Sequence, residues 1–254
     1  MKKRFVPVLF LLAACLLQAA TGFSQVKKTP VRKTTTTKKI IKKPVVKKAI
    51  VNKIQPIRIK IVTDSGTMIV KLYDSTPLHR DNFVKLVKEG FYDSLMFHRV
   101  IPQFMIQGGD PTSKYAETGA RLGNGGDDLG RIPAEFRTTL FHKKGVLAAA
   151  RDDNPEKASS ACQFYIVEGK RFTDEQLKMM EEQRGIKFSP VQRLAYKTIG
   201  GTPFLDQGYT VFGEVEKGLD VIDKIANVPR DANNRPLGDI RMHMEIMAPV
   251  IKSK

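Results

Sequence analysis

The sequence predicts a mainly β fold, a closed eight-stranded antiparallel barrel. The first observation behind this prediction is that apolar and polar residues alternate in several short segments, as they do in half-buried strands. The second is that loops rich in glycine and aspartate separate several of these segments, GNGGDDLG at 123–130 being the clearest. About eight such strands with few helices favour a barrel, because closure removes the exposed edges of a sheet.

The barrel is expected to begin near Pro56 with a β-hairpin. Residues 57–63 read IRIKIVT and residues 67–73 read TMIVKLY, and both alternate. Asp64-Ser65-Gly66 between them is a turn signal, because aspartate and glycine favour tight turns. We therefore expect the first two strands to pair with each other.

A helix is expected to follow the hairpin, capped by Thr76, with Pro77 at its first position and Gly90 as its stop. A later helix spans roughly Gly218–Ala226, where apolar residues form one stripe. The remaining strands are expected at Leu95–Val100, Phe104–Gln107, Gly145–Ala149, Gln163–Val167, Thr210–Val215 and Ile240–Met247.

One segment departs from this succession of strands and indicates a helical insertion at about 170–200. Thr173 and Gln176 have the spacing of a capping box, in which each residue bonds the other's main chain. Ser189-Pro190 indicates a second helix start. We expect these helices to interrupt the barrel domain, which is assigned to residues 56–254.

Positive charge is concentrated before this domain. Of the net charge of +17, fourteen units come from lysines and arginines before Ile54, and three come from the rest of the chain. Residues 25–55 are a Lys-, Thr- and Pro-rich segment of low complexity, whose self-repulsion predicts an extended linker. We expect a tether, with attachment to an anionic membrane surface as the sharper alternative. Aromatic residues for base stacking are missing from the linker, so nucleic acid is not an expected partner.

The first residues have the pattern of a bacterial export signal, assigned to residues 1–24. A basic start, MKKR, precedes a short apolar run, and Gly22-Phe23-Ser24 suits a signal peptidase, leaving Gln25 first. The alternative is a lipoprotein signal, in which Cys15 would carry lipid and anchor the chain. The two cases predict a periplasmic protein and a membrane-anchored lipoprotein respectively. Without Cys15 the chain keeps one thiol, Cys162, which we expect to be buried.

Three chemistries are disfavoured by the residues themselves. The four histidines lack the close spacing of metal ligands, so no metal site is expected. The chain contains no GxSxG nucleophile motif. Gly108-Gly109-Asp110 and Gly123 to Gly126 lack the lysine of a phosphate loop, and we interpret them as a bulge and a surface loop. Arg99, inside the apolar run FHRVIPQFMIQGGD, remains to be explained, since an unpaired buried guanidinium is costly.

FHRVIPQFMIQGGD resembles the signature of the cyclophilins, the peptidyl-prolyl cis-trans isomerases. NFVKLVKEGFYDSLMFHRVI, GVLAAAR with ACQFYIV, and PFLDQGYTVFGEV are similar to further segments of that family, in the same order. The resemblance extends from about Pro56 to Met247 and is interrupted by the insertion. It implies an eight-stranded antiparallel barrel capped by two helices, isomerase (rotamase) activity, and no cofactor. We expect a monomer.

The resemblance also implies a site. Arg99 would be the catalytic group, donating a hydrogen bond to the prolyl nitrogen when the amide twists, and Gln107 would orient Arg99 and the substrate. Proline-containing peptide segments of client proteins would be the partners. The substrate-binding positions that the resemblance implies are Phe97, His98, Phe104, Met105, Ala150, Gln163, Phe164, Tyr165, Phe204, Leu205 and Tyr209.

Four positions depart from the family pattern. Phe204 stands where many relatives have Trp, so we expect weaker binding of cyclosporin. Tyr209 stands in place of His, and Tyr165 in place of Phe, which adds a hydroxyl at the pocket. Arg151 replaces an Asn, and the loop after it is longer and more acidic than usual.

These features predict an exported isomerase that assists the folding of exported proteins. The alternative is a peptide-binding or scaffold module of the cell envelope with little turnover. In that case the insertion and the loop after Arg151 would be its partner surfaces.

Overall fold

The computed structural model describes residues 55–248. The predicted signal peptide, Cys15 and nearly all of the basic linker lie outside the described residues, so these assignments stay predictions. Within residues 55–248, no helix is both long and apolar enough to cross a bilayer.

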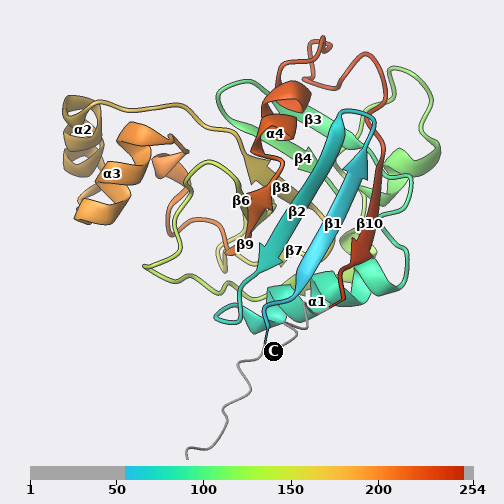
Figure 1. The fold of residues 1–254 in the computed structure, drawn as a ribbon, viewed down its shortest axis with the longest axis horizontal. Helices are drawn as coiled ribbons and strands as arrows, with labels where there is room; N and C mark the ends of the chain where they lie inside the picture. Colours follow the sequence, from blue (N-terminus) through green and yellow to red (C-terminus); the bar gives the residue numbers. More distant parts are fainter. Residues whose placement is uncertain (1–54, 249–254) are drawn as a thin grey trace, which may run out of the picture. The chain divides into compact units, whose positions relative to one another are not determined.

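Eight antiparallel strands form one sheet, in the order β10-β1-β2-β9-β6-β8-β4-β3 (Figure 1). The ends of the expected strands are displaced by only one or two residues. In chain order the strands are β1 (Arg58–Thr63), β2 (Gly66–Leu72), β3 (Phe97–Ile101), β4 (Met105–Gly108), β6 (Val146–Ala149), β8 (Phe164–Val167), β9 (Val211–Lys217) and β10 (Met242–Ile246). Two short strands, β5 (Arg131–Ile132) and β7 (Ser159–Ser160), pair separately.

The prediction of a closed barrel is wrong, because the sheet is an open, curled half-barrel. Within the described residues, its end strands β3 and β10 share no ladder. The chain at their starts is joined by one isolated bridge, between Met96 and Arg241, and by three main-chain hydrogen bonds beside it. The chain before β3 turns through Ser94, which has a positive φ of 67°. The Ser94 N–H still bonds the Met242 carbonyl, but the turn takes the preceding chain away from β10, so these hydrogen bonds do not continue as a ladder. The alternation of apolar and polar residues indicates how many strands to expect, but it does not show whether the first and last strands of the sheet pair.

Two helices cover the hydrophobic interior of the sheet. Figure 1 shows α1 (Pro77–Lys88) below it and α4 (Leu219–Ala226) above it. Each helix contributes one apolar stripe, and strand residues that point inward complete the core. Cys162 is buried in this core, as expected, and burial raises the pKa of its thiol to about 11.

The insertion consists of two helices, α2 (Asp174–Arg184) and α3 (Pro190–Thr198), which lie beside the sheet (Figure 1). Both predicted starts are confirmed, because Thr173 and Ser189 each form a full capping box. The helices enclose a small hydrophobic core of their own, made by Phe172, Leu177, Phe188 and Tyr196.

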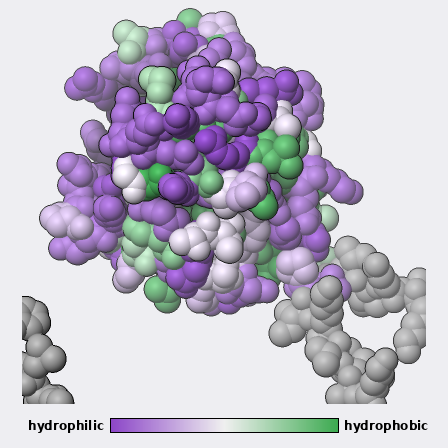
Figure 2. Space-filling view, turned by 90° about the vertical axis from the view of Figure 1, so that its left-hand side faces the viewer, coloured by the Kyte–Doolittle hydropathy of each residue, from purple (hydrophilic) through white to green (hydrophobic). Residues whose placement is uncertain are grey.

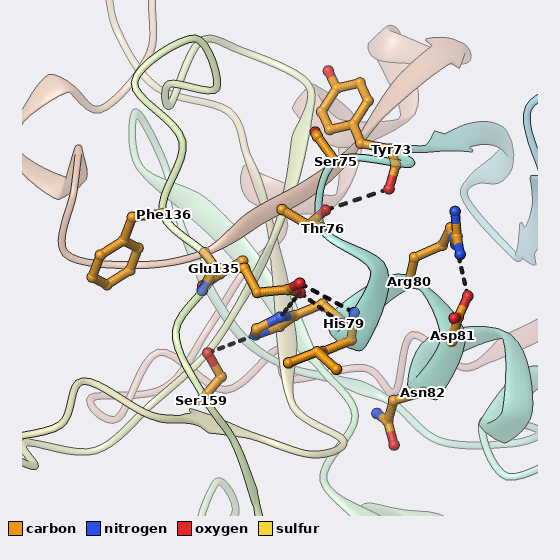
Figure 3. A network of polar contacts seen from close by, with 12 residues as sticks. Tyr73, Ser75, Thr76, His79, Arg80, Asp81, Asn82, Glu135, Phe136 and Ser159 are labelled. Atoms are coloured by element: carbon orange, nitrogen blue, oxygen red, sulfur yellow. Dashed lines mark hydrogen bonds and ion pairs between the residues drawn. The ribbon is translucent and has the colours of Figure 1, made fainter.

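The start of α1 differs from the prediction. Thr76 occupies the capping position, but its hydroxyl bonds the Tyr73 carbonyl at 3.5 Å and caps no helix N–H group. The carboxylate of Glu135 does this instead, accepting from the N–H groups of Leu78 at 3.2 Å and His79 at 3.0 Å (Figure 3). A cap from a residue so distant in sequence leaves no local signal, which explains the error.

The same carboxylate also bonds the His79 ring. Glu135 Oε2 lies 2.7 Å from Nδ1 of His79, and Nε2 of His79 lies 3.0 Å from the Ser159 hydroxyl (Figure 3). Burial lowers the pKa of His79, which favours a neutral ring that donates through Nδ1 and accepts from Ser159. The order acid–histidine–serine is that of a hydrolase triad. However, Ser159 is 1% exposed and the cavity beside His79 measures about 10 Å³, so no substrate could enter.

Replacing Glu135 by Ala is expected to lower the free energy of unfolding by about 3 kcal/mol, because two helix N–H groups and one ring N–H lose a buried acceptor. Urea denaturation monitored by circular dichroism measures this change. Glu182→Ala is the control, since Glu182 is exposed and only faces Lys178 on α2. Equal midpoints for the two variants would contradict the assigned role of Glu135.

Candidate active site

Strand alternation separates two hydrophobic clusters on the two faces of the sheet. On β8, Phe164 and Ile166 face the main core, whereas Tyr165 and Val167 face a second cluster. The second cluster also takes Met105 from β4, together with residues of β6 and β9. Successive side chains of a strand point to opposite faces, so this outer face has its own row of side chains.

A pocket of about 100 Å³ opens on this outer face. It lies between the strands β3, β4 and β8 and the segment around η3 (Pro203–Leu205). Apolar and aromatic side chains form most of its wall, with one arginine and one glutamine at its edge and a second arginine at its rim. Its lining residues are Arg99, Phe104, Met105, Gln107, Ala150, Arg151, Tyr165, Leu205 and Tyr209.

Arg99 reaches this pocket because β3 contains a bulge. The register between β3 and β4 shifts between Phe97 and Arg99, and Arg99 then pairs with Gln107 of β4. The Arg99 side chain is half-buried and donates from Nη1 to Gln107 Oε1 at 3.1 Å. Within residues 55–248 no carboxylate forms an ion pair with Arg99, and burial lowers its pKa. Its remaining N–H groups are therefore available to a ligand.

A chain of amides fixes the direction of this hydrogen bond. Gln163 Nε2 donates to the carbonyl oxygens of Gly123 at 3.0 Å and Gly125 at 2.9 Å. Its Oε1 must then accept, and it does so from Gln107 Nε2 at 3.1 Å. The Oε1 of Gln107 consequently faces Arg99 as an acceptor. Backbone carbonyls cannot donate, so the amide orientations follow from the partners.

The glycine-rich loop is thus an anchor for the site, and its position is itself fixed. Asp110 accepts hydrogen bonds from Thr112 N at 2.8 Å and from Gly123 N. Gly109 has a φ of 94°, and a Cβ there would meet the Cys162 carbonyl oxygen at 2.2 Å. Only glycine fits so close an approach. The interpretation as a surface loop therefore missed the role of Gly123 and Gly125.

A second hollow of about 430 Å³ adjoins the pocket. The two share Gln107, Ala150 and Arg151 as lining residues, so they form one groove. Arg151 lies over the Tyr209 ring, 4.7 Å from its centre, and donates from Nε to the Gly208 carbonyl at 2.9 Å. Arg151 is thus a groove residue that the site prediction did not include.

The structure brings together most, but not all, of the predicted site residues. Gln163 lines the second hollow, and Phe204 packs on Phe104 at the rim, with ring centres 5.6 Å apart. His98 lies on the other side of Arg99, beside a hollow of about 360 Å³. The residues placed in the pocket are Arg99, Gln107, Phe104, Met105, Ala150, Tyr165, Leu205 and Tyr209.

Phe97 and Phe164 do not line the groove. Both are buried in the main core, where their rings pack edge to face with centres 6.1 Å apart. Phe164 was misplaced because successive side chains of a strand point to opposite faces, so Phe164 and its neighbour Tyr165 cannot both face the groove. The bulge explains that of Phe97, since Phe97 and Arg99 would otherwise point the same way.

Comparison with known proteins identifies the family. The family model described as cyclophilin type peptidyl-prolyl cis-trans isomerase/CLD matches residues 58–246. The chain belongs to this family and is an isomerase of the cyclophilin type.

Bacterial proteins described as peptidyl-prolyl cis-trans isomerases are among its relatives. One from Staphylococcus haemolyticus is 35% identical over 187 residues, covering 72% of this chain and 87% of the relative. One from Staphylococcus epidermidis is 36% identical over 193 residues, covering 74% and 91%. A crystal structure of a cyclophilin-type isomerase from Cryptosporidium parvum shares the fold, with a TM-score of 0.55 and 22% identity over 76% of this chain and 98% of that one.

Stability is expected to fall as the pH drops below about 6.5, and His98 should account for much of the slope. Burial lowers the pKa of His98 to about 4, against 6.5 for an exposed histidine. Between these values the unfolded chain binds the proton and the folded chain does not, so acid favours unfolding. Buried His79 contributes in the same direction.

Urea midpoints measured between about pH 4.5 and pH 7.5 test this linkage. His98→Gln should flatten the slope relative to the wild-type chain, because the substituted side chain has no group that titrates in this range. An unchanged slope in His98→Gln would contradict the assignment.

Proposed function

We propose that the groove around Arg99 is the active site, with Arg99 as the catalytic residue. The observation that carries this proposal is a half-buried guanidinium that pairs with no carboxylate of the described residues and is oriented by Gln107 toward an apolar pocket. An arginine that served only the fold would be expected to pair with an acid or to reach water.

The chemistry that this arrangement supports is rotation about an X–Pro bond. Resonance between the nitrogen lone pair and the carbonyl creates a barrier of about 18–20 kcal/mol. Twisting the amide localises the lone pair on nitrogen, where a guanidinium N–H can bond it. Because that bond forms mainly in the twisted state, it lowers the barrier instead of only strengthening binding.

The pocket walls have the character that a proline ring requires. Phe104, Met105 and Leu205 offer an apolar surface beside Arg99, so the ring would be held while the preceding carbonyl turns. Ala150 already bonds Gln163 and Ser160 through its main chain, so a peptide would extend along Arg151 and into the second hollow. The Arg151 stack on Tyr209 would form one edge of its path.

Arg99→Ala is expected to lower kcat/KM for a proline-containing tetrapeptide by about 10²–10³-fold, the usual loss when a transition-state donor is removed. Cis–trans relaxation followed by a protease-coupled or NMR exchange assay measures the rate. Arg171→Ala is the matched control, because Arg171 is exposed and outside the groove. Wild-type activity in Arg99→Ala would place the active site elsewhere, or would favour a binding module with little turnover.

We further propose that this isomerase is exported and acts on proline-containing segments of exported client proteins. The support is the signal-like start at 1–24 and the basic linker at 25–55, which would tether the domain near an anionic membrane surface. The described domain needs no disulfide, since Cys162 is its one cysteine and is buried.

Intact mass of the protein isolated from its native host tests the export proposal. We expect a chain that begins at Gln25, and a lipid increment on Cys15 would instead indicate a membrane-anchored form. A chain that retains MKKR at its start would overturn export.

A further inference from the structure

The hydroxyl of Tyr165 leads from the proposed pocket into a buried polar network. Tyr165 lines the pocket, and its hydroxyl lies 2.9 Å from Nε2 of His142. Nδ1 of His142 lies 2.9 Å from Asp206 Oδ1, which also accepts from the His142 main-chain N–H at 2.8 Å. A phenylalanine at position 165 could not make the first of these contacts.

The network ends in the helical insertion. The other carboxylate oxygen of Asp206 accepts from the Tyr196 hydroxyl of α3 at 2.6 Å. Because a carboxylate only accepts, His142 donates through Nδ1, and Nε2 of the neutral ring accepts from the Tyr165 hydroxyl. The two links to Asp206 have one possible direction, because its carboxylate can only accept. The four side chains are at most 5% exposed, so water does not compete for these bonds.

A second contact joins the insertion to the same wall of the pocket. Arg184, at the end of α2, donates to the carbonyl oxygens of Pro203 at 2.9 Å and Asp206 at 3.1 Å. These two residues flank Phe204 and Leu205, of which Leu205 lines the pocket and Phe204 packs on Phe104. Main-chain bridges of Gly201 hold the chain just before η3, and the Arg184 bonds hold η3 at Pro203 and just after its end.

The outer surface of the insertion gives no comparable sign of a large docking face. The exposed apolar residues of α2 and α3 are Met179, Val191 and Leu194. Figure 2, which faces this side, shows hydrophobic residues as separate patches within a mainly hydrophilic surface. The contacts that the insertion makes with the rest of the domain include the Tyr196 and Arg184 hydrogen bonds described above.

We propose that the α2–α3 insertion is a positioning element of the isomerase. It fixes the proline pocket through the relay Tyr196–Asp206–His142–Tyr165 and through Arg184. These are positioning residues, because the insertion touches the pocket wall and not the reacting amide. The inference rests on the proposed site around Arg99. Since the wall binds the proline ring equally in the ground and twisted states, loosening it should raise KM and leave kcat nearly unchanged.

A matched pair of arginines tests the outer contact. Arg184→Met keeps the side-chain stem and removes both bonds to the η3 segment, and we expect KM for a proline tetrapeptide to rise about two- to fourfold. Arg193→Met removes an arginine that pairs only with Asp174 and Glu181 inside the insertion. Its KM should stay at the wild-type value. Equal KM values in the two variants would overturn the proposal, and neither substitution touches a buried core.

The relay itself is tested by a double-mutant cycle. Tyr196→Phe and Tyr165→Phe each remove one hydroxyl and keep the ring, and each should raise KM about three- to tenfold. If one relay carries both effects, the double variant should be no worse than the worse single variant. Effects that multiply, or a KM unchanged in Tyr196→Phe, would overturn it.

Arg99→Ala separates failure of this inference from failure of the site. A loss of kcat in Arg99→Ala with no KM change in the relay variants leaves the site intact and removes the positioning role. Full activity in Arg99→Ala would show that the pocket itself is misassigned.

Discussion

A guanidinium held half-buried without a carboxylate is the constraint on which the site depends. A carboxylate beside Arg99 would compete with any substrate for its N–H groups, whereas the Gln107 amide orients the group and leaves its other donors free. The Gln107 amide could, however, rotate by 180° and present its NH₂ group to Arg99 in place of its oxygen. The carbonyls of Gly123 and Gly125 prevent this rotation, because they can only accept and so hold the Gln163 nitrogen. The Gln163 oxygen then accepts from the Gln107 nitrogen, which leaves the Gln107 oxygen facing Arg99. The position of one charge is therefore set by a loop more than twenty residues away in sequence.

The parts of the fold that the sequence predicted are those with local causes. The capping boxes at Thr173 and Ser189 lie within four residues, and the strands follow from alternation that needs no partner. The parts that it missed have distant causes. Glu135 caps a helix that begins nearly sixty residues earlier, and closure of the sheet depended on whether pairing with β10 could continue past the turn at Ser94.

The same distinction applies to the candidate site. The run from Phe97 to Asp110 identified Arg99, Gln107, Phe104 and Met105, and the pocket contains all four. The prediction included both Phe164 and Tyr165, and the alternation of side chains along a strand could have excluded one of them, since neighbours face opposite ways. The bulge that sends Phe97 inward has no comparable signature. Nor could sequence show that Asp206, which directly follows a pocket residue, holds His142.

Two buried acid–histidine pairs flank the groove, and both occur where the sheet ends. Glu135 with His79 holds Ser159 of β7, next to Ser160 in the wall of the second hollow. Asp206 with His142 holds the η3 segment at the other wall. Strands are positioned by their ladders, but the segments between them have no such support. A buried carboxylate costs desolvation and is tolerated only where its partners are all present. That requirement makes each loop adopt one position, and a groove whose floor is sheet and whose walls are loops needs both anchors to keep its shape.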